Sequence, residues 1–175
     1  MFATSASILD ATRRPFLEQF QLVCENASLL TSKETDIGRA EGSQWNLVGV
    51  YLWSVITGNS PSAEHVVYIG KTRSFRRRVQ EYRRGFQAHS PNDYKLQVFQ
   101  HVVHDKDELA TFRLYFRSVP VEEITATEND AVERFDPVLN RRAPVSSEAR
   151  SDFQRAFERY YTAGFNAHFT ANSDA

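Results

Sequence analysis

Two short apolar segments each place a tyrosine beside a glycine, Gly49-Val50-Tyr51 and Tyr68-Ile69-Gly70. The second runs directly into residues 71–84, a segment with seven Lys or Arg side chains and one acidic residue, Glu81. Those basic residues are Lys71, Arg73, Arg76, Arg77, Arg78, Arg83 and Arg84. Clustered positive charge beside paired phenols suggests a site that binds phosphate.

Glu128 is the next residue whose position suggests chemistry. It falls on the apolar stripe of a predicted helix, four residues after Ile124 and three before Ala131. A carboxylate on such a face is costly unless it is paired or binds a cation. Three interpretations remain open. Glu128 forms an ion pair with an inward arginine, closes a capping box that begins at Thr125, or binds a divalent metal such as magnesium through oxygen.

Hydrolysis of a phosphodiester requires a group that takes a proton from water, a cation that neutralises the phosphate, and stabilisation of the departing alkoxide. Tyr51 and Tyr68 supply phenols. A free phenol has a pKa of about 10, so it needs positive charge nearby to act as a base at neutral pH. Lys71, Arg78 and a cation at Glu128 would supply that charge. In the simpler alternative, each tyrosine is a core aromatic with a hydrogen-bonded hydroxyl.

The strands that must position these residues are predicted from hydrophobic patterning. Residues 47–56 form a continuous apolar run, typical of a strand buried on both faces. Residues 65–69 form a second strand, joined to the first as a hairpin with a long loop. Residues 111–118 alternate, which predicts a third strand with one solvent-exposed face. Gly49 and Gly70 weaken their strands, so each marks a bulge or a close approach to the backbone.

Apolar residues at steps of three and four predict the helices. A helix over residues 74–85 begins at the N-cap Ser74 and buries Phe75, Val79 and Tyr82. Val121 opens another helix, which ends before Pro137. The remaining helices are predicted over residues 12–30, from Ser90-Pro91 onward, and after Pro144 as far as Gly164.

The composition fits one soluble domain with terminal additions. The chain has 175 residues and a net charge of −1, so its basic character is local and does not indicate a globally basic nucleic-acid binder. A single cysteine, Cys24, excludes a disulfide framework and a thiolate zinc cluster. No apolar run approaches a membrane span, and the N-terminus lacks a signal-peptide pattern, so we expect a cytoplasmic protein that does not contact membranes. The expected organisation is a helical N-terminal extension (1–44), a core (45–143), and a C-terminal helix with a frayed tail (144–175).

These residues together resemble the GIY-YIG nucleases over about residues 46–142. The two tyrosine–glycine segments stand for the two signatures, and Arg78 follows Tyr68 by ten residues. Glu128 is then followed by Pro137 after nine residues and by Asn140 after twelve. The resemblance implies an α+β fold in which a small three-stranded antiparallel sheet is flanked by helices. The patterning described above independently predicts three strands with helices between and after them.

The resemblance also implies a single-metal mechanism. Glu128 would bind the divalent cation, magnesium; Tyr51 would be the general base, Tyr68 would orient the water, and Arg78 would stabilise the phosphate charge. Asn140 would support the site by hydrogen bonding, and Lys71 would add positive charge. Tyr82 stands where many members have histidine, which puts a histidine-dependent proton route in doubt. The remaining arginines would contact nucleic acid: Arg73, Arg76, Arg77, Arg83 and Arg84.

The expected function is therefore a metal-dependent DNA endonuclease. A compact stand-alone chain fits a restriction-type enzyme, in which a homodimer would place one active site on each strand. RNA remains possible as a substrate. The alternatives are a catalytically inactive nucleic-acid-binding or regulatory module, and a structure-selective repair nuclease. The blandest alternative is a structural domain whose arginines form a solvated face.

Overall fold

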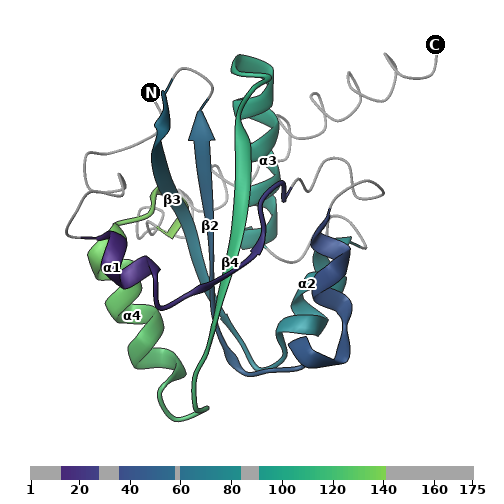
Figure 1. Cartoon of the computed structure of the whole chain (residues 1–175), viewed down its shortest axis with the longest axis vertical. Coiled ribbons are helices and arrows are strands. Elements are labelled where there is room, and N and C mark those ends of the chain that lie inside the picture. The colour runs from purple at the N-terminus through teal and green to yellow at the C-terminus, as the bar shows by residue number, and fades with distance from the viewer. Residues whose placement is uncertain (1–12, 28–35, 58–59, 84–90, 141–175) are drawn as a thin grey trace, which may run out of the picture.

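Figure 1 presents the computed structural model, which describes residues 13–27, 36–57, 60–83 and 91–140. A four-stranded sheet forms the centre, in the order β1-β4-β2-β3, with every neighbouring pair antiparallel. Its strands are β1 (Gln21–Cys24), β2 (Gly49–Thr57), β3 (Ser60–Thr72) and β4 (Thr111–Ser118). The α+β class is confirmed. The predicted count of three strands is wrong, because β1 adds a fourth.

Helices cover both faces of the sheet (Figure 1). One face carries α1 (Arg14–Leu17) and α4 (Ile124–Phe135), and the other carries α2 (Phe75–Arg83) and α3 (Pro91–Lys106). Short 3-10 helices span Asp36–Glu41, Ser43–Trp45 and Val138–Asn140. Each face has its own buried cluster, one around Trp53 and Phe75 and the other around Leu52 and Phe135. No helix in the described ranges is long and apolar enough to cross a bilayer.

The N-terminal segment differs most from its prediction. The helix expected over residues 12–30 ends at Leu17, and residues 21–24 instead form β1, which pairs with β4. Of the apolar residues that gave this prediction, Phe16, Phe20 and Ala27 are buried and Val23 is partly buried. A short helix followed by a strand buries the same residues on two faces of the sheet, since pairing with β4 overrides the local pattern. The segment is therefore part of the fold and not a helical extension.

The hairpin that carries both tyrosine–glycine segments is confirmed, but its loop is short. β3 begins at Ser60, well before the predicted residue 65, and Ser60 pairs with Thr57. β2 is buried along most of its length, because it has a strand on each side and a helical layer on each face. β3 is an edge strand, where Pro61 can be accommodated.

Two predictions about faces are wrong. β4 has no wet face at Tyr115, which is buried in the cluster formed with α1 and α4. Val121, expected to point inward at the start of a helix, precedes α4 and is 52% exposed. The predicted end of α4 is confirmed: Asp136 adopts a left-handed conformation (φ 41°) immediately before Pro137. The helix predicted after Pro144 and the tail lie outside the described residues.

Candidate functional site

The glycines of the two segments are sites of close approach. A Cβ on Gly70 would lie 2.5 Å from the hydroxyl oxygen of Tyr51, and a Cβ on Gly49 would collide with the backbone carbonyl of Arg117. The β2–β3 register is regular at both positions, since Gly49 pairs with Thr72 and Gly70 with Tyr51. Of the two interpretations of these glycines, close approach is therefore confirmed and a bulge is not.

Arg78 is brought to Tyr51 by the first turns of α2. Ser74 caps this helix as predicted, because its Oγ accepts a hydrogen bond from the Arg77 amide (3.3 Å). From there the Arg78 Nε donates to the Tyr51 hydroxyl oxygen (2.9 Å), and a second guanidinium nitrogen donates to Glu81 (3.0 Å). The Arg78 side chain keeps 15% of its surface exposed, so the guanidinium is held in place at the edge of the core.

Two tyrosines, Tyr51 and Tyr82, contact this guanidinium, and the ring of a third, Tyr68, neighbours that of Tyr51. The Tyr82 hydroxyl donates to the Tyr51 oxygen (3.2 Å), and the Arg78 guanidinium lies 4.4 Å from the centre of the Tyr82 ring. The rings of Tyr51 and Tyr68 lie 6.2 Å apart. The Tyr51 oxygen therefore accepts hydrogen bonds from two donors, one of them a cation. These bonds fix the position of that oxygen.

Glu128 belongs to a second polar group, on the opposite face of β3. Its carboxylate forms an ion pair with the Lys71 Nζ (2.8 Å), and Lys71 also donates a hydrogen bond to the Thr125 hydroxyl (3.2 Å). The capping-box interpretation is wrong, because α4 is capped at Glu123 and Thr125 lies inside the helix. An ion pair is confirmed, with lysine in place of the expected arginine. The Glu128 side chain is 19% exposed, so it remains accessible from solvent.

The two groups meet at two consecutive residues of β3. Gly70 pairs with Tyr51 and lies beneath its hydroxyl, whereas Lys71 pairs with Val50 and reaches Glu128. Successive strand residues point to opposite faces, so the phenols lie on the α2 face and the carboxylate lies on the α4 face. β3 is the last strand of the sheet, so both groups border the same edge. Their convergence in a single cleft remains a prediction.

Asn140 stabilises the outer edge of β3 by hydrogen bonding. Its Oδ1 accepts from the Ile69 amide and its Nδ2 donates to the Ile69 carbonyl, both at 2.7 Å. The side-chain amide thus bonds both backbone groups of one edge-strand residue, as a neighbouring strand would. Ile69 lies between Tyr68 and Gly70, so Asn140 holds the segment that carries the site. The resemblance implies that Asn140 supports the site by hydrogen bonding, and that role stays a prediction.

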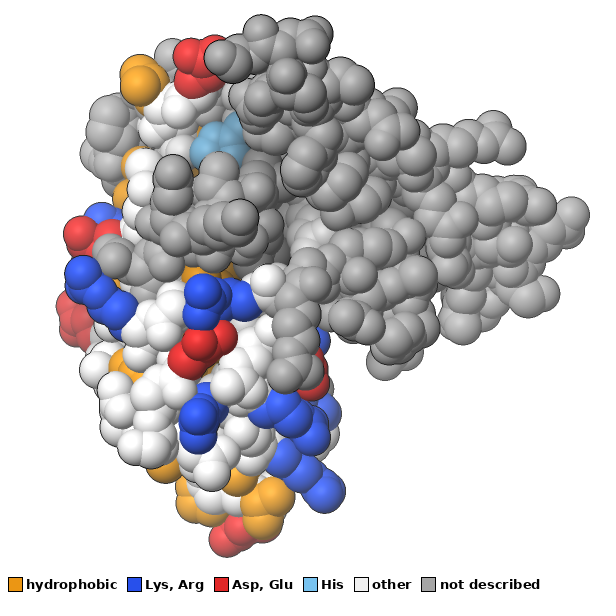
Figure 2. Space-filling model, turned by 90° about the vertical axis from the view of Figure 1, so that its right-hand side faces the viewer, with side chains coloured by type: hydrophobic (Ala, Val, Ile, Leu, Met, Phe, Trp, Pro, Cys, Tyr) orange, Lys and Arg blue, Asp and Glu red, His pale blue; other side chains and the backbone are white. Residues whose placement is uncertain are grey.

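The basic residues form an exposed surface around α2. Arg73, Arg76 and Arg77 are exposed. Arg83 is exposed as well, but it pairs with Glu41 (2.6 Å), and Arg84 lies outside the described residues. Figure 2 shows Lys and Arg side chains gathered on the lower half of the face on which α2 lies.

The described residues contain no group of three or more His, Cys, Asp or Glu side chains that could hold a metal. A cation at Glu128 would therefore have one protein carboxylate and would take its other ligands from water and phosphate. Magnesium commonly binds in this way, with few carboxylates and several retained waters. The single, partly exposed carboxylate fits such an ion.

Two acidic residues, Glu81 and Glu64, make polar contacts that the sequence did not single out. Glu81 was noted only as the acidic residue of a basic segment, although its position three residues after Arg78 is a recognisable helical ion-pair spacing. Glu64 carried no signal. It is buried and accepts hydrogen bonds from Ser54 (2.5 Å), Tyr115 (2.7 Å) and Arg113 (3.1 Å). Burial and this carboxylate raise the pKa of Tyr115, so its hydroxyl remains a proton donor to Glu64.

Comparison with protein-family models, curated proteins and solved structures found no match for this chain.

Proposed function

We propose that the protein is a metal-dependent endonuclease that hydrolyses DNA phosphodiester bonds. The observation that carries the proposal is the junction at Gly70 and Lys71. Gly70 lies beneath the Tyr51 oxygen, which accepts a hydrogen bond from Arg78. Lys71, the next residue, forms an ion pair with Glu128. A general base, a guanidinium for phosphate and a ligand for a cation thus border one sheet edge.

In this proposal Tyr51 takes the proton from the attacking water. Arg78 and Tyr82 stabilise the negative charge that the Tyr51 oxygen must carry to do so. The Arg78 guanidinium, which also bonds Glu81, would place its positive charge against the phosphate. Tyr68, whose ring neighbours that of Tyr51, orients the water.

Glu128 would hold the divalent cation, and a bound magnesium ion supplies positive charge against the scissile phosphate. Lys71 neutralises this carboxylate in the structure described here. Its ammonium group can move to a substrate phosphate once the carboxylate has another cation, because it lies on a flexible stem.

The exposed arginines around α2 provide the surface for the DNA backbone. Arg73, Arg76 and Arg77 lie on or next to the helix that carries Arg78. Phosphate contacts of this kind position a duplex without reading its sequence. We further propose a restriction-type role in which two copies of the chain each cut one strand.

A nucleic-acid-binding module without catalysis is the second candidate. The 2.8 Å ion pair between Lys71 and Glu128 favours it, because the carboxylate is already satisfied without any metal. In this case the arginines around α2 would still bind polyanions, with affinity that falls steeply as salt rises.

A cleavage assay separates the two candidates. Purified protein is incubated with supercoiled plasmid, linear DNA and RNA, with magnesium or with a chelator. The nuclease proposal predicts cutting that requires metal and is lost in Glu128→Gln. Absence of cutting across several divalent ions, with DNA binding retained, would instead establish the binding module.

Glu133→Gln is the matched control, because Glu133 lies on the same helix and is exposed. It makes the same change of charge and should cut as the unmodified chain does. Circular dichroism of both variants checks that α4 remains folded. Equal loss of activity in the two variants would show that charge on α4, and not the Glu128 ligand position, governs the reaction.

A further inference from the structure

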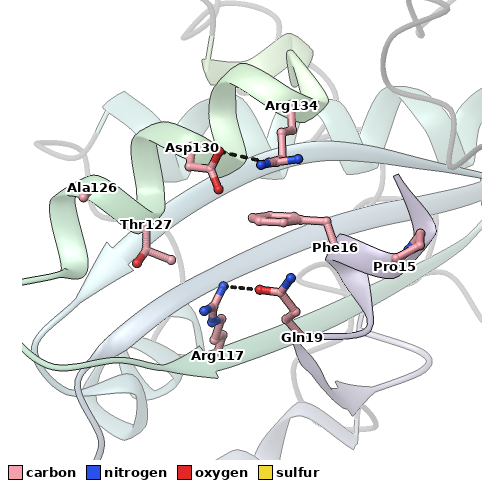
Figure 3. Close-up of a pocket in the computed structure, with 8 residues that line it drawn as sticks. All are labelled: Pro15, Phe16, Gln19, Arg117, Ala126, Thr127, Asp130 and Arg134. Carbon is pink, nitrogen blue, oxygen red and sulfur yellow. Dashed lines mark hydrogen bonds and ion pairs between the residues drawn. The ribbon is translucent and has the colours of Figure 1, made fainter. Parts of the chain in front are cut away.

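An open groove of about 500 Å³ lies between α1, β4 and α4 (Figure 3). This volume falls within the range of small-molecule sites, about 300–1,000 Å³. Thr127, Asp130 and Arg134 line the groove from α4, whereas Glu128 of the same helix bonds Lys71 on β3. Successive helical residues are rotated by about 100°, so the groove and Glu128 occupy different flanks of α4.

Arg117 brings a guanidinium to this groove from β4. Its guanidinium donates to the neutral Gln19 Oε1 (2.6 Å), and it has no carboxylate partner among the described residues. Arg113, on the same face of β4, is paired with both Glu64 and Glu25. Arg113 is therefore neutralised by carboxylates. Arg117 is instead held in position by a neutral amide, which does not neutralise its charge.

The opposite wall fixes a second guanidinium. The Arg134 Nε bonds Asp130 (2.9 Å), and the guanidinium lies 4.8 Å from the centre of the Phe16 ring. Figure 3 shows Phe16 between this pair and the Arg117–Gln19 pair. Two guanidiniums and one carboxylate leave the lining with one net positive charge. Thr127 adds a hydroxyl that has no hydrogen-bond partner within the described part of the chain.

We infer that this groove binds a phosphate group. Arg117 presents two N–H donors to two phosphate oxygens, and the Thr127 hydroxyl donates to a third. A carboxylate ligand has only two oxygens and would use Arg117 alone, whereas phosphate uses donors on both walls. The phosphate belongs either to a free nucleotide or to the backbone of the nucleic acid that the proposed function requires. The second source rests on that proposed function, and the first does not.

Titration of the ¹⁵N-labelled protein with deoxyadenosine monophosphate, in chelator, tests the free nucleotide. Saturable shifts are expected at the amides of Gln19, Arg117 and Thr127. Arg117→Gln and Thr127→Val should each weaken binding, the first by about tenfold or more because it removes a charged hydrogen-bond donor. Lys106→Gln is the control on the other sheet face, because Lys106 is exposed at the end of α3, and it should leave the nucleotide affinity unchanged.

Binding of a short DNA duplex in chelator tests the backbone source. In this case Arg117→Gln weakens duplex binding by about tenfold, while the mononucleotide gives no saturable shifts. Either pattern supports a phosphate site in the groove. The inference is overturned if both ligands bind the Arg117 and Thr127 variants as tightly as the unmodified chain, or if neither ligand shifts the groove amides. Both binding measurements are made in chelator. If Glu128-dependent cutting is absent, the two measurements still report on the groove.

Discussion

The Tyr51 hydroxyl is the most constrained atom of the candidate site. It accepts bonds from Arg78 and Tyr82 while lying against the backbone of Gly70. Glycine is required at residue 70 because any side chain there would occupy the place of the phenol oxygen. This close approach gives a physical reason for the spacing of the two tyrosine–glycine segments, since Tyr51 and Gly70 are register partners.

Gly70→Ala should therefore damage both folding and activity. A Cβ 2.5 Å from a buried phenol forces the ring to move, and such overpacking costs about 1–3 kcal/mol of unfolding free energy. Gly38→Ala is the control, because its Cβ would meet only the end of the flexible Arg83 side chain, at 3.4 Å. Urea unfolding of both variants is the measurement. Equal stability of the two would contradict the packing of Tyr51 described above.

Arg78→Ala should fold normally and lose about 100-fold or more in single-turnover cleavage rate, because it removes a preorganised donor to developing charge. Lys106→Ala is the control, since its side chain is 67% exposed at the end of α3 and lies outside the arginine surface around α2. Unfolding of the Arg78 variant would instead make this residue a structural partner of Tyr51. Unchanged cleavage by a folded Arg78→Ala protein would remove it from the reaction.

At the scale of single residues, much of the candidate site could be predicted from the chain. Patterning places Tyr82 on the buried face of a helix and the resemblance singles out Arg78, and the structure brings both to Tyr51. The partner of Glu128 could not be predicted, because Lys71 is 57 residues away and helical periodicity reports only which side of α4 is buried. Long-range pairing of this kind depends on sheet register, which single segments do not encode.

Among the elements, the central strands are tied together by the buried carboxylate of Glu64. It bonds Ser54 of β2 and both Arg113 and Tyr115 of β4. Glu64→Gln should lower the unfolding free energy by about 2 kcal/mol or more, because it leaves buried donors poorly paired. Glu25→Gln is the control: this exposed residue approaches Arg113 only at 3.6 Å and should change stability by less than about 0.5 kcal/mol. Denaturant unfolding that gives equal values for the two variants would contradict the network.

The β2–β3 hairpin also carries a pH-sensitive residue. Burial lowers the pKa of His65 below its ordinary value of 6.5. The unfolded chain therefore binds more protons than the folded one as the pH falls below about 6.5, and unfolding becomes easier there. His65→Gln should reduce the loss of stability between about pH 7.5 and pH 5.5 in denaturant titrations. An identical pH profile in the variant would contradict this assignment.

Secondary structure was predictable where a segment has one consistent hydrophobic pattern. β2, α2 and the end of α4 follow their patterns closely. The N-terminal segment failed because its apolar residues, spaced by three and four, serve a short helix and then a strand on different faces. The loop of the hairpin was overestimated for a related reason: polar and proline residues are tolerated on an edge strand, so β3 extends through them.

On the scale of the whole molecule, the candidate site lies along the outer edge of β3, the last strand of the sheet. The α2 layer brings the phenols and Arg78 to one side of this edge, and the α4 layer brings Glu128 to the other. Asn140 occupies the outer backbone groups between them.

The most direct test of this arrangement uses manganese as a paramagnetic probe of the metal position. Manganese bound at Glu128 should broaden the amide signals of Gly70 and Lys71 and the ring signals of Tyr51. Leu109, which is highly exposed and follows α3, serves as the distant reference and should keep its signal. Glu128→Gln should abolish the broadening. Broadening that spares Gly70 and Tyr51, or that persists in Glu128→Gln, would contradict a shared metal-dependent site at the β3 edge.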